Sequence, residues 1–183
     1  MGLSSALLAF KGITAEQVHT RLGLRVTGRV EDDSNSDINS TLLPSQWYLL
    51  VLNREEFKDS QLQELSSGCE LFYQMIEEHV MYSAAKLWSD CQLRWAVEHN
   101  GEEGGRELKV AGDPPKSFDS IRDELMEAQS NETDEVDHVF DIPVRLGKEV
   151  LGFTIYDGES DTPKQEFQIL ERTERRKKLF GIF

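Results

Sequence analysis

The sequence contains few of the features that mark membrane, exported or disulfide-bonded proteins. No apolar run approaches the roughly 18 residues that a transmembrane helix requires, and residues 1–10 lack both the basic start and the long apolar core of a secretory signal. The chain has two cysteines, Cys69 and Cys91, which are expected to be reduced thiols rather than part of a disulfide framework. We therefore expect a cytoplasmic protein that does not bind membranes.

Positive charge is also scarce. The chain has 20 Lys and Arg against 34 Asp and Glu, for a formal net charge of -14. Because nucleic acids and anionic membranes must be neutralised by bases, this balance argues against both as partners. The charge is uneven: residues 98–137 hold 13 acids and four bases, whereas residues 164–183 hold six bases and three acids. The acidic excess serves either solubility alone or the binding of a basic protein partner.

Motifs of known catalytic or metal chemistry are missing as well. The sequence has no H-E-x-x-H helix, no C-x-x-C pair and no G-x-S-x-G. The glycine-rich segment 101–105 carries two glutamates, which repel phosphate, so it fits neither a Walker loop nor a dinucleotide fingerprint. We expect no cofactor and no metal. The best candidates for a His/Asp site beside the sheet are His99, His138 and Asp141.

Hydrophobic periodicity predicts an α+β fold built on an antiparallel meander. Apolar residues alternate over 71–75 and 93–97, and 81–88 forms a third segment. The run 47–52 is continuously apolar, which indicates a strand buried on both faces. Residues 24–30 suit a strand, and residues 3–10 suit either a strand or a short buried helix. The link at residues 89–91 is expected to be a longer or bulged loop, because tight hairpin turns need positive φ and usually contain Gly or Asn.

Helices are predicted between and after these strands. Thr14 and Gln17 form a capping-box pattern that opens a helix over 15–22, and a second helix is expected over 59–65. Ser117 is a suitable N-cap for the clearest helix, whose apolar stripe should cover Trp95 together with the neighbours predicted to share its face, Leu93 and Val97. Residues 141–151 form the last helix, with Pro143 near its start. We expect these helices to pack on one face of the sheet.

The domain prediction follows from these elements. Residues 1–163 are expected to form a single α+β domain, in which 1–66 is a semi-separate N-terminal half. Residues 164–183 are expected to be a basic C-terminal tail. The tail ends in an apolar group that is predicted to dock into an apolar groove, on its own domain or on a neighbouring chain: Leu179, Phe180, Ile182 and Phe183.

The segment from about Leu87 to Phe153 resembles a group of small acidic bacterial proteins that are uncharacterised. The most specific matches are Trp95 and His99, Gly112 with Pro114-Pro115, and Asp137 with Asp141-Ile142-Pro143. The pattern of the group has glycine after the acidic turn residue, where this chain has Cys91. The resemblance implies no biochemical activity.

Three hypotheses for function follow. The first is a non-catalytic protein-binding module, similar in role to an immunity or inhibitor protein, whose acidic surface includes Glu102, Glu103, Asp123 and Glu127. The second is an enzyme or small-ligand-binding domain that uses the His/Asp group named above. The third is a structural or assembly subunit that forms a homo-oligomer through the apolar end of its tail.

Overall fold

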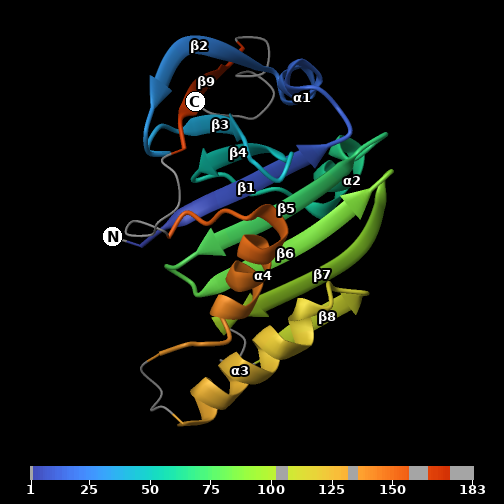
Figure 1. The fold of residues 1–183 in the computed structure, drawn as a ribbon, viewed down its shortest axis with the longest axis vertical. Coiled ribbons are helices and arrows are strands. Elements are labelled where there is room, and N and C mark those ends of the chain that lie inside the picture. The colour runs from blue at the N-terminus through green and yellow to red at the C-terminus, as the bar shows by residue number, and fades with distance from the viewer. Residues whose placement is uncertain (1, 102–106, 132–135, 157–164, 174–183) are drawn as a thin grey trace.

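The computed structural model of the chain describes residues 2–101, 107–131, 136–156 and 165–173. The strands are β1 (Ser4–Lys11), β2 (Leu24–Glu31), β3 (Ile38–Leu42), β4 (Tyr48–Asn53), β5 (Glu70–Glu77), β6 (Tyr82–Ser89), β7 (Gln92–Asn100), β8 (Leu108–Gly112) and β9 (Phe167–Arg172). The helices are α1 (Ala15–Leu22), α2 (Asp59–Leu65), α3 (Ser117–Asn131) and α4 (Asp141–Leu151). Within the described residues the strands form one antiparallel sheet in the order β2-β9-β3-β4-β1-β5-β6-β7-β8 (Figure 1). The predicted α+β class with an antiparallel meander is confirmed.

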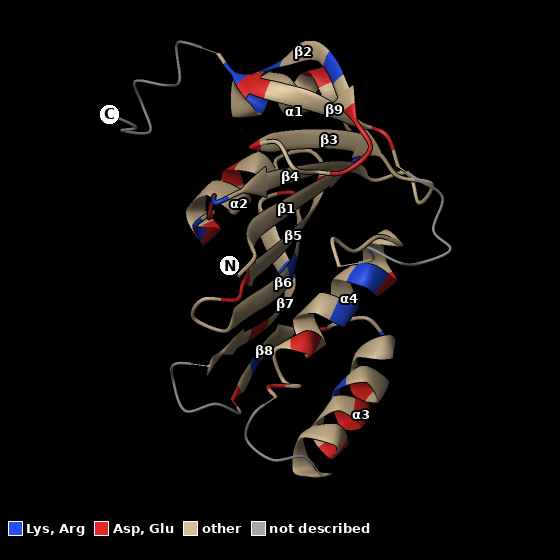
Figure 2. Cartoon of the chain, turned by 90° about the vertical axis from the view of Figure 1, so that its left-hand side faces the viewer, with Lys and Arg blue, Asp and Glu red and all other residues tan. Residues whose placement is uncertain are grey.

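The sheet has a hydrophobic core on each face. On one face α1 and α2 cover a cluster that includes Phe10, Leu62 and Tyr73. On the other face α3 and α4 cover a cluster that includes Phe72 and Trp95. Figure 2 shows α2 on one side of the sheet and α3 and α4 on the other. The helices were expected on one face, and the structure corrects this: the central strands are buried on both faces and need a helical layer on each. Among the described residues, no helix is both long and apolar enough to span a bilayer.

The link between β6 and β7 is a two-residue turn, so of the two predicted alternatives, a longer or a bulged loop, the longer loop is wrong. Asp90 and Cys91 both have positive φ, 48° and 61°, as a tight turn of the primed type requires. Neither is glycine, and hydrogen bonds from the preceding segment hold the turn: the Gly68 amide donates to the Asp90 carboxylate, and the Cys91 amide donates to Ser66 Oγ. These partners replace the glycine that the turn usually needs.

A β-bulge beside this turn decides which side chains reach the core. Leu87 pairs with Trp95 but Trp88 pairs with Leu93, so Arg94 is the extra residue in β7. Trp95 and Val97 are therefore buried in the cluster beneath α3, as predicted, whereas Leu93 is 38% exposed. The prediction that Leu93 shares the face of Trp95 is wrong because the bulge reverses the alternation of side chains at Arg94.

Strand β9 lies inside the sheet, although its residues belong to the segment predicted as a tail. It pairs with β2 on one side and with β3 on the other, and Phe167 and Leu170 are buried. At the other end of the sequence, β1 and β4 from residues 1–66 lie at the centre of the sheet, and β1 pairs directly with β5. The two halves of the chain therefore share one sheet and both cores.

Candidate functional site

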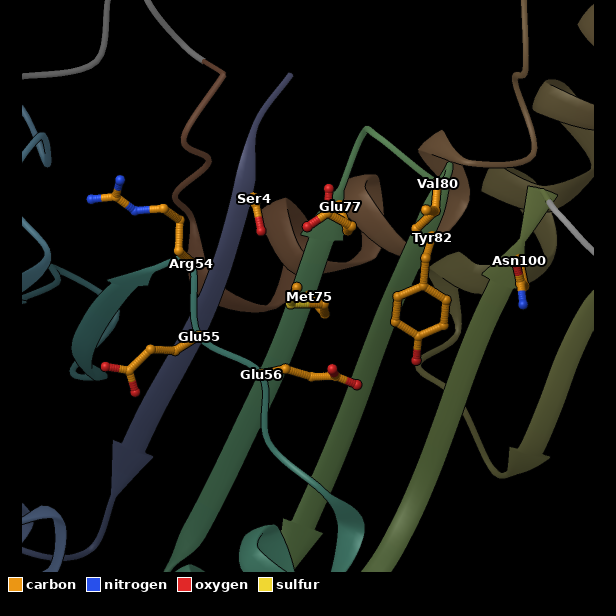
Figure 3. A pocket seen from close by; sticks show the side chains of 9 residues that line it. All are labelled: Ser4, Arg54, Glu55, Glu56, Met75, Glu77, Val80, Tyr82 and Asn100. Atoms are coloured by element: carbon orange, nitrogen blue, oxygen red, sulfur yellow. The ribbon is translucent and has the colours of Figure 1, made fainter. Parts of the chain in front are cut away.

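A pocket of about 350 Å³ lies on the α2 face of the sheet, between the loop that follows β4 and the ends of β5, β6 and β7 (Figure 3). It is lined by Ser4, Arg54, Glu55, Glu56, Met75, Glu77, Val80, Tyr82 and Asn100. The register places Glu77 opposite Tyr82 and Tyr82 opposite Asn100, so three neighbouring strands present polar side chains in one row. One row deeper, Met75 lies opposite the small residue Ala84.

The pocket has an apolar floor and an acidic rim. Met75 is buried under the centre of the pocket, and the ring of Tyr82 stands at one wall (Figure 3). The side chain of Glu56 points into the pocket toward Tyr82, whereas that of Glu55 points away (Figure 3). Glu55 forms an ion pair with Arg172 at the end of β9. Among the described residues no ion pair involves Glu56, so its negative charge remains available to a ligand.

Glu77 adds a second carboxylate to the rim, and its proton affinity is reduced. Burial alone would raise the pKa of Glu77, but hydrogen bonds from Ser4 and from the His79 ring and amide outweigh it and hold the pKa below its ordinary value. The His79 Nδ1 atom lies 2.6 Å from Glu77 Oε1. Glu77 is therefore ionised at neutral pH.

A buried lysine organises the charges deeper in the sheet. Lys86 Nζ lies 2.9 Å from Asp59 Oδ1 and 3.1 Å from Glu98 Oε2, and its side chain is only 8% exposed. Tyr82 donates a hydrogen bond of 2.9 Å to the same Glu98 oxygen. Burial, followed by the charge of Glu98, raises the pKa of Tyr82, so the phenol stays neutral and keeps its role as a donor. This chain of contacts fixes the wall of the pocket from α2 to β7.

Tyr73 extends the same polar group. Its hydroxyl accepts a hydrogen bond from the Phe57 amide at 3.5 Å, which ties the loop carrying Glu56 to β5. Burial raises the pKa of Tyr73, and the charges of Glu56, Asp59 and Glu98 raise it further. Clusters of perturbed titratable groups beside a cavity are typical of functional sites. The arrangement suits a cationic group on an aliphatic stem: the floor accepts the stem, and the carboxylates accept the charge.

The predicted His/Asp group lies on the other face, where His99 bonds to Asp137. The His99 side chain is fully buried, with Nε2 2.8 Å from Asp137 Oδ2 and Nδ1 3.1 Å from the Glu107 carbonyl oxygen. A carbonyl oxygen only accepts, so Nδ1 is the donor in its hydrogen bond to Glu107. Asp137 Oδ1 also accepts the amides of Val139 and Phe140 at the start of α4. The pair therefore ties the β7–β8 hairpin to α4.

The other two residues of the predicted His/Asp group, His138 and Asp141, lie at the start of α4. Asp141 is the first residue of α4, where burial raises its pKa and the neighbouring His138 partly counters this. His99 has no exposed side-chain atoms and both of its ring nitrogens are occupied, so in this conformation it cannot reach a substrate. Among the described residues, no group of three or more His, Cys, Asp or Glu side chains could hold a metal ion.

The predicted acidic surface is only partly within the described residues. Asp123 and Glu127 lie exposed on the outer side of α3, which faces away from the sheet on the side opposite the pocket (Figure 2). Asp123 forms an ion pair with Arg122 at 2.8 Å. Glu102, Glu103 and the tail residues Leu179, Phe180, Ile182 and Phe183 lie outside the described residues.

The pocket itself was not found by reading the sequence, although one signal pointed to it. Lys86 is the one charged residue of β6, and a lysine at such a position requires acidic partners when buried. Its partners, Asp59 and Glu98, are 27 and 12 residues away in sequence, and only the fold brings them together. Comparison with protein-family models, curated proteins and solved structures finds no match to this chain. The function is therefore inferred from the geometry of the pocket.

Proposed function

We propose that the protein is a non-catalytic protein-binding module that takes a basic side chain of a partner protein into the acidic pocket. The observation that carries the proposal is Glu56, which points over an apolar floor and has no ion pair among the described residues. A lysine or arginine stem can lie against Met75 and Val80 while its charge meets Glu56 and Glu77. The net charge of -14 favours the approach of such a partner over long range.

The contacts of the pocket lining and of the polar residues behind it favour binding over chemistry. Lys86 is held between two carboxylates, Tyr82 is kept neutral, and Glu77 is held by Ser4 and His79. These groups are therefore fixed as donors and acceptors, which reduces the entropy lost when a ligand is bound. A module that covers a basic surface in this way would act as an inhibitor or immunity-like protein acts on its target. The basic protein partner is thus the expected ligand class.

The test is a pull-down from the native host with two matched charge reversals. Glu56→Lys changes the pocket, and Glu127→Lys makes the same change of charge at an exposed site on α3. We expect Glu56→Lys to abolish capture of the partner and to leave circular dichroism unchanged. Glu127→Lys should slow association only, and less so as salt rises, because a rim charge is screened over about 8 Å at physiological ionic strength.

Three other outcomes would change the proposal. If Glu127→Lys loses the partner and Glu56→Lys does not, the binding surface lies on α3, where Asp123 is also exposed. Equal capture by both variants and the parent would show that the acids serve solubility only. A partner without a basic surface would contradict the charge argument itself.

A further inference from the structure

The last described strand, β9, ends beside the loop that lines the pocket. Arg172, at the end of β9, forms an ion pair with Glu55, which lines the pocket. The next residue, Thr173, donates its amide to the Gly23 carbonyl at 2.8 Å, so the chain is anchored where the described residues end. Glu56 follows Glu55 in sequence and points into the cavity (Figure 3). The described part of the chain therefore ends, at Thr173, next to the residue that pairs with Glu55.

The sequence of that segment complements the pocket in charge. Residues 174–183 read ERRKKLFGIF, with four consecutive bases at 175–178 and a single acid. The pocket has the opposite sign, since Glu56 and Glu77 face it, whereas the lining residues Glu55 and Arg54 are already paired with Arg172 and with Asp37, respectively. An extended chain spans roughly 3.3 Å per residue, so a base two to five residues after Thr173 can lie roughly 7–17 Å beyond it, with the length of its own side chain in addition.

We propose that the occupant of the acidic pocket in the free protein is this chain's own C-terminal segment, with one of the bases at 175–178 beside Glu56. The inference rests on the proposed function, because it names what a basic partner must displace. A tethered segment has an effective concentration of the order of millimolar, so even a weak contact would be well populated. The segment would then act as an internal competitor that sets a threshold for partner affinity.

The experiment keeps the full chain and changes only the charge of the segment. In the neutral-tail variant, Arg175, Arg176, Lys177 and Lys178 are all replaced by Ser, so length is unchanged. The probe is a fluorescein-labelled synthetic peptide of residues 173–183, and its dissociation constant is measured by fluorescence anisotropy at low salt. Because the parent pocket is already filled, we expect the peptide to bind the neutral-tail variant about tenfold more tightly than the parent.

Two further substitutions place the peptide in the pocket. Glu56→Gln, added to the neutral-tail variant, should weaken peptide binding at least several-fold. Glu127→Gln, the matched control on α3, should leave it unchanged. Equal affinity of the parent and the neutral-tail variant would overturn the inference, as would absence of binding or binding that does not depend on Glu56. A tail-dependent dimer in sedimentation would assign the segment to a second copy and overturn the intramolecular form proposed here.

Failure of the inference is distinguishable from failure of the proposed function. If Glu56 is required for partner capture while the tail has no effect on peptide binding, the pocket binds a partner but is not occupied by its own chain. If the tail effect is found while partner capture does not depend on Glu56, the pocket serves the chain itself and the proposed function fails.

Discussion

Gly112→Ala is predicted to be the most damaging single-methyl change in the sheet. Gly112 ends β8 with a φ of +69°, and a Cβ built on it would lie 2.0 Å from the Arg94 carbonyl oxygen and 3.0 Å from Trp95 Cα. Both neighbours are backbone atoms of β7, and Arg94 is the bulge residue. The methyl group can be accommodated only if β8 moves away from β7.

The magnitude follows from two contributions. A non-glycine residue in the left-handed region costs about 1–2 kcal/mol. Separation of the strands would also break the hydrogen bond from the Asp113 amide to the Arg94 carbonyl, worth about 1 kcal/mol. We therefore expect a loss of about 2–3 kcal/mol in the free energy of unfolding, with an increased exposure of the Trp95 ring beneath α3.

The assay is urea denaturation followed by tryptophan fluorescence, and Gly28→Ala is the matched control. Gly28 has a similar φ of +78° in the β2 bulge, but no atom lies within 4 Å of its added Cβ. The control therefore carries only the conformational cost, and the difference between the two variants measures the close approach at Arg94. If Gly112→Ala is no more destabilising than Gly28→Ala, the reasoning about the β7–β8 contact is refuted.

Three further predictions concern the core, the buried lysine and pH. Trp95→Ala should cost about 3–5 kcal/mol in urea denaturation, and a variant as stable as the parent would contradict its place in the core. Lys86→Met should cost about 2–3 kcal/mol, because it leaves the partly buried Glu98 carboxylate without its cation, and Lys86→Ala should cost more through the cavity it leaves; a Lys86→Met variant as stable as the parent would show that the ion pairs do not stabilise the fold. Burial lowers the pKa of His19 below 6.5, so its contribution to stability is present above pH 6.5 and is lost as the pH falls through the lower folded value. Unfolding of His19→Gln should lack this loss between pH 7 and pH 5, and identical pH profiles for variant and parent would contradict it.

Local signals predicted local structure well. Thr14 accepts from the Gln17 amide and the Gln17 side chain accepts from the Thr14 amide, as the capping-box pattern predicted, and α1 ends at Gly23 with a φ of +65°. The residues that decide these features are within ten positions of one another, so their energetics are contained in the sequence pattern.

The missed features all depend on contacts between distant residues. The turn at Asp90 is held by Gly68, 22 residues earlier. Strand β9 has only Phe167 and Leu170 as buried apolar residues, Ile169 is partly buried, and the other three residues are polar, so its place in the sheet is set by pairing with β2 and β3. The pocket combines the loop after β4 with three strands, and Glu56 and Asn100, which line it, are not recognisable as neighbours from spacing.

The position of β9 also sets the order in which the molecule can be completed during synthesis. Among the described strands, β2 pairs only with β9, and Leu24 and Arg172 are partners across 148 positions of the chain. When synthesis has reached the end of α4, β9 has not yet emerged from the ribosome. Strand β2 therefore has no hydrogen-bond partner while β1, β4 and β5 pair. Pairing between such distant strands is slow, because the entropy cost of closing a long loop comes before the contacts that offset it. We expect amide exchange at Val26 to stay fast in chains arrested before residue 167 and to slow only once Arg172 has left the exit tunnel.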